Sequence, residues 1–290
     1  MIKSLRLKSV EEASILVLAF GACLLCALLV NIAGFQPVPT SAVIAVLASA
    51  LGNRCNAPGG YSLAVYAGTF AGMGKVSASG SIVFSLLALS LIVAAVVFSF
   101  HRMTRTQPKL ALKGLGGRLG FFGFISFTMF SVLILHRLPT YHTALFNVAT
   151  LVVSMAAIFA GAAATTIVRR TFGGDTAHYN VLASALIGAV GSLALMTRHE
   201  YCQTFAAGVF LGSFIAMSDL SCLRPRFLLL SGVIAALLLV LANTLFAGFG
   251  GLLGTVAVCS VAASRCIEAA CLRPQNSIEK DAGSLKLASP

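Results

Sequence analysis

Residues 68–73 read Gly-Thr-Phe-Ala-Gly-Met, and residues 212–217 read Gly-Ser-Phe-Ile-Ala-Met, so one short pattern occurs twice at a spacing of 144 residues. At the same spacing, and without a gap, Arg54 is matched by Arg198. Self-similarity of this kind indicates an internal repeat. The weight of the comparison rests on the clustered Gly, Phe and Met residues, because apolar segments elsewhere match one another by chance.

A second pattern supports the same division of the chain. Residues 114–120 read Gly-Leu-Gly-Gly-Arg-Leu-Gly, and residues 248–254 read Gly-Phe-Gly-Gly-Leu-Leu-Gly. The spacing is shorter here, at 134 residues, because a basic loop lengthens the first copy. We therefore predict a first repeat over 1–136, a second over 137–270, and a disordered tail over 271–290.

Composition places both repeats in a membrane. Of the 290 residues, 58% are apolar and 10% are charged, and the mean hydropathy is +0.96. A soluble domain is roughly half apolar and about a quarter charged. The sequence therefore predicts an all-α polytopic membrane protein. Its eight acidic residues leave little material for carboxylate chemistry.

Apolar runs bounded by charges, Pro or Gly mark the membrane segments. A bilayer core about 30 Å thick needs roughly 20 such residues per helix. Ten segments are predicted: 12–34, 38–53, 61–75, 81–100, 115–136, 143–168, 180–197, 203–218, 227–247 and 250–268. The pairs 38–53/61–75 and 180–197/203–218 either cross fully or are re-entrant half-helices, and the sequence leaves both readings open. The first segment is read as an uncleaved helix and not as a secretory signal.

Positive charge assigns the two sides of the membrane. If all ten segments cross, seventeen Lys and Arg residues lie on the side of the N-terminus, and Lys75, Arg137 and Arg198 lie on the other. Lys and Arg are retained in the cytoplasm, so both termini are predicted to be cytoplasmic. The basic stretch 101–118 is then a cytoplasmic loop that sets topology, and no nucleic-acid partner is predicted.

Five segments per repeat is an odd number, so the second repeat enters the membrane in the opposite orientation. Inverted five-segment repeats are typical of secondary transporters and channels, with the solute site near the midplane where the halves meet. This is an inference from architecture, and it does not identify a solute. We expect an inner-membrane channel or transporter for a small neutral or anionic solute.

The candidate site residues come from the symmetric patterns. Small residues either let helices pack closely or mark a broken helix that lines a path. The candidate solute pathway is Gly68, Thr69, Phe70, Gly72, Met73, Gly212, Ser213, Phe214, Met217, Arg54 and Arg198. The two arginines would attract an anion if their loops are re-entrant, but the interpretation as loop charges is favoured. Glu200 and Asp219 are the candidates for ion coupling.

Asparagines in or beside the apolar runs hold helices together or line a polar path. They are Asn31, Asn147, Asn180 and Asn243.

Other function classes lack the residues that they need. Cys23 and Cys26 form a CxxC inside an apolar run, where thiols behave as small hydrophobic groups. No zinc-ligand spacing, nucleophile elbow, phosphate-binding loop or dinucleotide fingerprint is present. We predict no catalytic residue, metal or cofactor. Two alternatives stay open: a non-catalytic subunit of an envelope, secretion or defence assembly, and a membrane-embedded enzyme or lipid-handling protein. A homo-oligomer or a membrane partner subunit is compatible with each reading.

Overall fold

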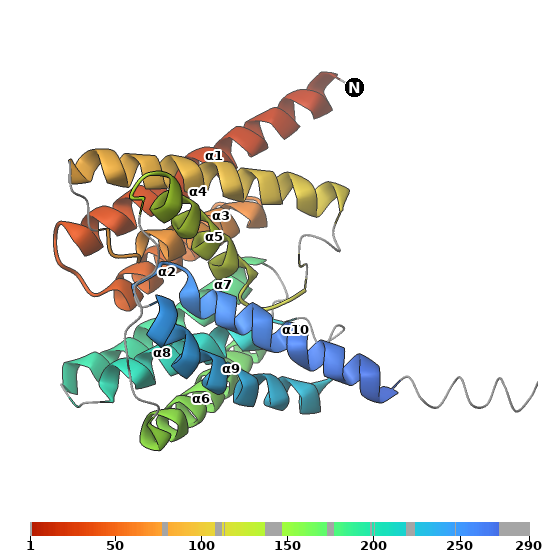
Figure 1. The fold of residues 1–290 in the computed structure, drawn as a ribbon. Helices are drawn as coiled ribbons and strands as arrows, with labels where there is room; N and C mark the ends of the chain where they lie inside the picture. Colours follow the sequence, from red (N-terminus) through yellow and green to blue (C-terminus); the bar gives the residue numbers. More distant parts are fainter. Residues whose placement is uncertain are drawn as a thin grey trace, which may run out of the picture.

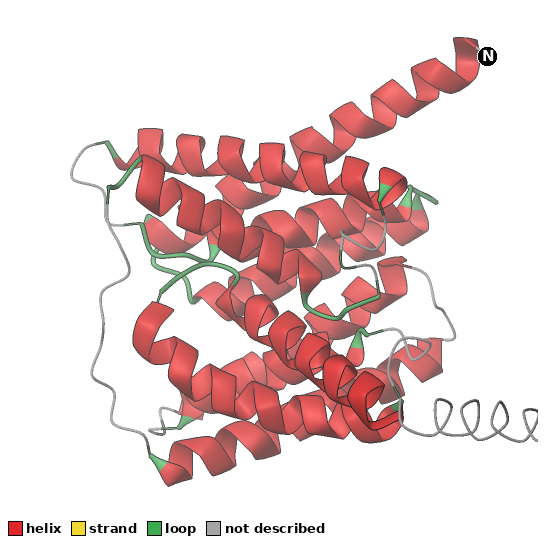
Figure 2. Cartoon of the chain, turned by 45° about the vertical axis from the view of Figure 1, so that its right-hand side comes forward, coloured by secondary structure: helices red, strands yellow, loops and turns green. Residues whose placement is uncertain are grey.

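Helices make up almost all of the described chain (Figure 2). The computed structural model describes residues 2–76, 81–107, 112, 114–136, 147–172, 177–197, 199, 201–218, 224–246 and 248–272. The elements are α1 (Ile2–Asn31), α2 (Pro37–Arg54), α3 (Gly59–Gly72), α4 (Ile82–Thr106), α5 (Arg118–Leu133), α6 (Val148–Phe172), α7 (Ala177–Ser192), the 3-10 helix η1 (Leu193–Thr197), α8 (Cys202–Ala216), α9 (Pro225–Phe246) and α10 (Leu252–Leu272).

Local chemistry accounts for several helix starts. Pro37 is the first residue of α2 and Pro225 the first of α9, where the missing N–H group costs nothing. The side-chain oxygen of Asn147 accepts the backbone N–H of Ala149 at 2.9 Å and so caps α6. Asn147 therefore caps the start of α6, which differs from the two roles expected of the asparagines.

Six helices are long and apolar enough to cross a bilayer. The qualifying stretches are Val10–Asn31, Ile82–Thr106, Val148–Phe172, Ala177–Thr197, Arg226–Asn243 and Leu252–Cys271. Two shorter apolar helices, α5 and α8, accompany them. At about 1.5 Å per residue, each of the six stretches approaches or exceeds the 30 Å hydrocarbon core. The prediction of an all-α, multi-pass membrane protein is confirmed.

The outward faces of these helices are apolar. Phe84, Leu91 and Leu229 are each more than 60% exposed, although all three lie in long helices. Large apolar surfaces of this kind are rare on soluble monomers and are normal against lipid. The lipid-facing side and the packed side of these helices are therefore both apolar, so polarity does not distinguish them.

The first five helices and the last five pack in the same way. In the N-terminal half (residues 2–136), α1 packs on α3 and α4, α2 on α3, and α5 on α3 and α4. In the C-terminal half (residues 147–272), α6 packs on α8 and α9, α7 on α8, and α10 on α8 and α9. The pairs α2–α7 and α5–α10 join the halves, which lie above and below each other in Figure 1.

Helices α3 and α8 form the centre of the protein. Every residue of 64–72 in α3 and of 208–216 in α8 is buried. Their aromatic rings meet between the halves, with the centroids of Phe70 and Phe214 5.0 Å apart and those of Tyr66 and Phe70 4.3 Å apart. The two patterns that begin at residues 68 and 212 thus occupy equivalent places in the core.

Helices α5 and α10 meet at their N-terminal ends in the middle of the protein (Figure 1). A Cβ atom on Gly120 would stand 2.6 Å from the Cα of Gly254, so only glycine permits this approach. The glycine directly before each of the two helices has a left-handed backbone, with φ of +83° at Gly117 and +80° at Gly251. The second sequence pattern therefore encodes the same turn twice.

Ion pairs connect helix ends on the side where α1 begins and α10 ends (Figure 1). Arg105 at the end of α4 contacts Glu11 in α1 at 2.8 Å, and Arg224 before α9 contacts Glu268 in α10 at 3.4 Å. Residues 101–106 of the predicted basic loop 101–118 thus belong to α4, which ends at Thr106. At the other end of α1, Asn31 donates to the carbonyl of residue 74 at 3.1 Å and accepts the N–H of residue 76 at 2.8 Å.

Candidate functional site

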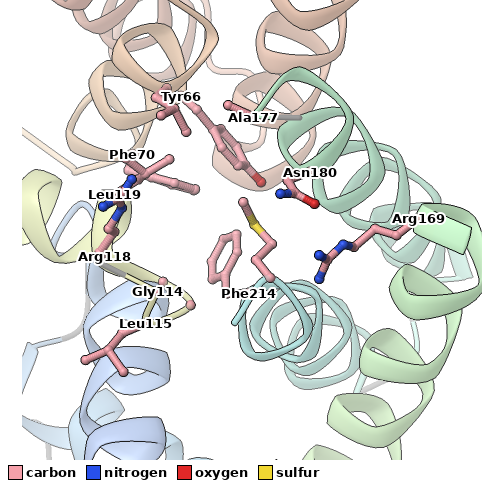
Figure 3. Close-up of a pocket in the computed structure, with 14 residues that line it drawn as sticks. Tyr66, Phe70, Gly114, Leu115, Arg118, Leu119, Arg169, Ala177, Asn180 and Phe214 are labelled. Carbon is pink, nitrogen blue, oxygen red and sulfur yellow. The ribbon is translucent and has the colours of Figure 1, made fainter. Parts of the chain in front are cut away.

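A cavity of about 500 Å³ lies between the two halves (Figure 3). The N-terminal half contributes residues of α3 and of the loop that leads into α5, and the C-terminal half contributes residues of α6, α7 and α8. The lining residues are Leu63, Tyr66, Phe70, Gly114, Leu115, Gly116, Gly117, Arg118, Leu119, Arg169, Ala177, Asn180, Phe214 and Met217. Its size falls within the usual range of small-molecule sites, about 300–1,000 Å³.

One wall of the cavity is aromatic. Tyr66, Phe70 and Phe214 line it, and each is at most 2% exposed. Phe210 packs behind them, with its ring centroid 4.5 Å from that of Phe214. Figure 3 shows Tyr66 and Phe214 facing the same space from α3 and α8. The aromatic cluster therefore closes the cavity on the side where the rings of α3 and α8 meet.

Polar groups are few and lie opposite one another. The side-chain oxygen of Asn180 is buried and accepts no hydrogen bond within the described part of the chain. Arg169 donates through Nη1 to the carbonyl of Ala216, the last residue of α8. Figure 3 places Arg118 on one side of the cavity and Arg169 on the other. Among the described residues, no acidic side chain lines this cavity.

Arg118 also borders a second cavity of about 280 Å³. This second cavity lies among α1, α3, α4 and α5, and its polar lining includes Glu11, His101 and Arg105. The Nε2 atom of His101 is buried and has no hydrogen-bond partner among the described residues. Arg118 is the first residue of α5, so its guanidinium stands at the positive end of that helix, between two cavities.

Hydroxyl groups form a chain behind the aromatic wall. Thr69 donates to the carbonyl of Tyr66 at 2.9 Å and accepts from Ser41 at 2.8 Å. Ser213, the counterpart of Thr69, donates to a carbonyl three residues back and is hydrogen-bonded to Ser184 at 2.8 Å. The Tyr66 hydroxyl closes the chain with a 3.1 Å hydrogen bond to Ser184. This chain couples α2, α3, α7 and α8.

Of the predicted pathway residues, the structure brings Phe70, Phe214 and Met217 together at the cavity. Thr69 and Ser213 are fully buried in the hydroxyl chain and are not among the lining residues.

The predicted pathway glycines pack helices together. A Cβ atom on Gly68 would stand 2.5 Å from the carbonyl oxygen of Ala19 in α1, and one on Gly212 would meet the carbonyl of Ile158 in α6. Gly72 continues the α1–α3 contact, and Met73 follows as the half-buried residue that caps α3. These positions sit behind the cavity, so a role for the glycines in a solute path remains a prediction.

The predicted charged residues lie elsewhere. Arg54 is exposed at the end of α2 and does not border either cavity. Arg198, Glu200 and Asp219 lie outside the described residues. Their proposed roles in anion attraction and ion coupling therefore stay predictions.

Tyr66, Arg118, Arg169 and Asn180 were missed as site residues by the sequence reasoning. One signal was available: the pattern at 114–120 carries Arg118 where its copy at 248–254 carries Leu252. This position, with a charge inside an apolar, glycine-rich repeat that the second copy lacks, is one where the two halves differ in charge. Asn180 was predicted only as one of the asparagines that either hold helices together or line a polar path.

Cys23 and Cys26 are buried in α1, where Gly72 packs against that helix. No three His, Cys, Asp or Glu side chains come together among the described residues. The thiols thus fill the contact between α1 and α3.

Comparison of the chain with protein-family models, with curated proteins and with solved structures finds no match.

Proposed function

We propose that the chain is a membrane conduit, a channel or secondary transporter for a small solute, whose path runs through the cavity between two inverted five-helix repeats. One observation carries this proposal: the 500 Å³ cavity is lined by both halves of the molecule and has an aromatic wall with a few polar groups. Sites of that composition are typical of small-molecule binding. Solute sites of inverted-repeat transporters lie where the halves meet.

Repeated packing supports the duplication. Each helix–helix contact among α1 to α5 in the N-terminal half has an equivalent among α6 to α10. The glycines of the second pattern repeat their backbone conformation, with φ of +86° at Gly114 and +82° at Gly248. Both the order of contacts and the local turns recur, although few residues are identical.

Reciprocal contacts support the inverted relation. A two-fold axis brings a residue against its own counterpart, so that each side of the contact is the same patch. Phe70 contacts Phe214, its counterpart in the pattern with a spacing of 144 residues. Gly120 contacts Gly254, its counterpart in the pattern with a spacing of 134 residues. We infer that the axis passes between these pairs and that they mark the middle of the membrane.

This position of the axis places the beginnings of α5 and α10 near the midplane. The 16 residues of α5 span about 24 Å, which is enough to run from the midplane to one face. In this proposal the discontinuous elements of the path are the loops before α5 and α10. The sequence had left it open whether the segments 38–53/61–75 and 180–197/203–218 cross fully or are re-entrant. Irregular backbone at membrane depth is tolerated where it lines a cavity.

The cavity faces the side on which the ion pairs lie. Its lining includes the loop before α5, Ala177 at the start of α7 and Met217 after α8, and the second cavity includes Arg105 and Glu11. The charge rule assigns this side to the cytoplasm. On the opposite side, the end of α3 is tied to the loop before α10 by a 2.9 Å hydrogen bond from the N–H of Lys75 to the carbonyl of Gly248.

Flux through proteoliposomes tests the proposal. Purified protein is reconstituted, and entry of urea, glycerol, acetate and benzoate is followed by light scattering for wild type, Asn180→Trp and Asn243→Trp. Asn180 lines the cavity, whereas Asn243 is exposed on α9, so the second variant controls for the new indole.

We expect wild type and Asn243→Trp to pass at least one solute and Asn180→Trp to block it. Thermal unfolding and size-exclusion profiles establish that both variants fold. Liposomes that behave like protein-free ones for every solute would reject a conduit. Equal flux through a folded Asn180→Trp would reject this cavity as the path.

A further inference from the structure

Arg118 stands between the two cavities without a described counter-ion. Its side chain lines both of them. Within the described part of the chain, no carboxylate lies within 4.0 Å of its guanidinium, whereas Arg102, Arg105 and Arg224 each have a carboxylate partner. The charge therefore lies at the contact between the halves with no described carboxylate within ion-pair distance, since Glu11, which also borders the second cavity, pairs with Arg105.

Holding such a charge away from bulk water is costly unless a partner balances it. Arginine keeps its proton in proteins, so Arg118 cannot escape this cost by becoming neutral. Its place at the first residue of α5 adds the positive end of a helix dipole to the same spot. A bound anion would offset both positive charges.

The other lining residues of the cavity indicate the chemistry of the rest of that anion. The same cavity is lined by the aromatic wall of Tyr66, Phe70 and Phe214, of which Phe70 is drawn beside Arg118 in Figure 3, and by the thioether of Met217. These groups favour an apolar body and offer nothing to a small, fully hydrated ion. Arg169 is hydrogen-bonded to a helix end, so Arg118 is the guanidinium that we assign to the ligand.

We propose that the cavity binds a small organic carboxylate, with its carboxylate group on Arg118 and its apolar body against the aromatic wall. A guanidinium matches a carboxylate through two parallel N–H···O hydrogen bonds, which makes it selective for planar oxyanions. The Asn180 side chain lies within the same cavity as an additional polar contact. This inference rests on the proposed function, because it identifies the class of solute for the same cavity.

Binding to the purified full-length protein tests the inference directly. Radiolabelled benzoate is the probe, and benzamide and inorganic phosphate are the competitors. Benzamide has the shape of benzoate without its charge, and phosphate has the charge without an apolar body. We expect saturable benzoate binding that phosphate and benzamide displace weakly. If benzamide displaces the probe as strongly as unlabelled benzoate does, the role of charge is overturned. If inorganic phosphate displaces it as strongly as unlabelled benzoate does, the proposal that the ligand is an organic anion is overturned.

Variants locate the site. Arg118→Gln is expected to weaken benzoate binding by about 10- to 100-fold, since it removes a charge-assisted pair. Arg54→Gln removes an exposed arginine from the end of α2 and should leave the affinity at the wild-type value. Arg118→Gln should unfold no earlier than wild type without ligand, because it removes an unbalanced charge. Unchanged affinity in Arg118→Gln would overturn the assignment.

The binding and flux results separate the two proposals. Benzoate binding without flux of any solute would reject the conduit and retain the anion site. Flux of urea or glycerol without benzoate binding would retain the conduit and reject the anion site.

Discussion

The substitution Gly68→Ala tests the helix packing on which the site depends. A methyl group at this position would stand 2.5 Å from the carbonyl oxygen of Ala19 in α1, whereas ordinary contact begins at 3.4 Å. Helices α1 and α3 must therefore separate by the difference, about 0.9 Å, because a backbone oxygen within a helix cannot turn aside. A gap of that size forfeits about a quarter to a half of the dispersion energy of the contacts that it opens.

The expected cost follows from two opposing effects. Overpacking a tight contact costs about 1–3 kcal/mol, and here the backbone carbonyl favours the upper half of that range. Alanine is better than glycine in a helix by about 1 kcal/mol, which offsets part of the cost. We expect Gly68→Ala to lower the free energy of unfolding by about 1–2 kcal/mol. Gly212→Ala should cost at least as much, since its methyl group would come even closer to the carbonyl of Ile158.

The assay is reversible unfolding in mixed micelles of dodecylmaltoside and SDS, followed by circular dichroism. Gly21→Ala is the matched control, because Gly21 lies in α1 with no atom within 4 Å of the added carbon. Its variant should be as stable as wild type or up to about 1 kcal/mol more stable. If Gly68→Ala unfolds at the same SDS fraction as Gly21→Ala, the close α1–α3 crossing is wrong, and so is the placement of the cavity in front of it.

Three further predictions use the same unfolding assay. His178→Ala removes a 2.6 Å hydrogen bond to a serine hydroxyl of α3 and a 2.8 Å hydrogen bond to the carbonyl of residue 57, so it should lower the free energy of unfolding by about 1–3 kcal/mol. His199 is exposed, and His199→Ala should change the free energy of unfolding by less than about 0.5 kcal/mol. Equal effects would contradict the contact between α3 and α7. Asn31→Leu leaves the carbonyl of residue 74 and the N–H of residue 76 without their side-chain partner and should cost about 1–3 kcal/mol, and no loss would show that water replaces it. Gly120→Ala and Gly254→Ala should each destabilise the protein, but the double variant should cost less than the two single costs added, because one separation of α5 from α10 accommodates both methyl groups. Additive costs would place the two glycines in separate contacts.

Much of the fold could be predicted from the sequence, because membrane helices are recognised by the length of their apolar runs and by the charges that flank them. The predicted segment 81–100 corresponds to most of α4 (Ile82–Thr106), and the short second segment at 38–53 corresponds to α2 (Pro37–Arg54). The weak point was where helices end. The polarity changes after residue 100, but the helix does not end there, because the basic residues that follow continue α4 to Thr106 and Arg105 pairs with Glu11 of α1.

The site was only partly accessible for a related reason. Phe70, Phe214 and Met217 were found because they recur in both halves. Arg118 and Asn180 were passed over because one belongs to a basic loop and the other to an apolar run, and neither context indicates a cavity. In a soluble helix, a polar stripe would tell the buried face from the exposed one, but here both faces are apolar.

By itself, the sequence determined the solvent of this protein, its helical class and the places where its pattern repeats. Hydrophobic length and the excess of Lys and Arg on one side are local quantities, and the bilayer acts on each segment separately. Only the tertiary structure decided that the repeated glycines pack helices together while two aromatic rings and Arg118 border a cavity. That difference depends on which helices approach one another, and a carbonyl of α1 or α6 within reach of a glycine is not visible along the chain.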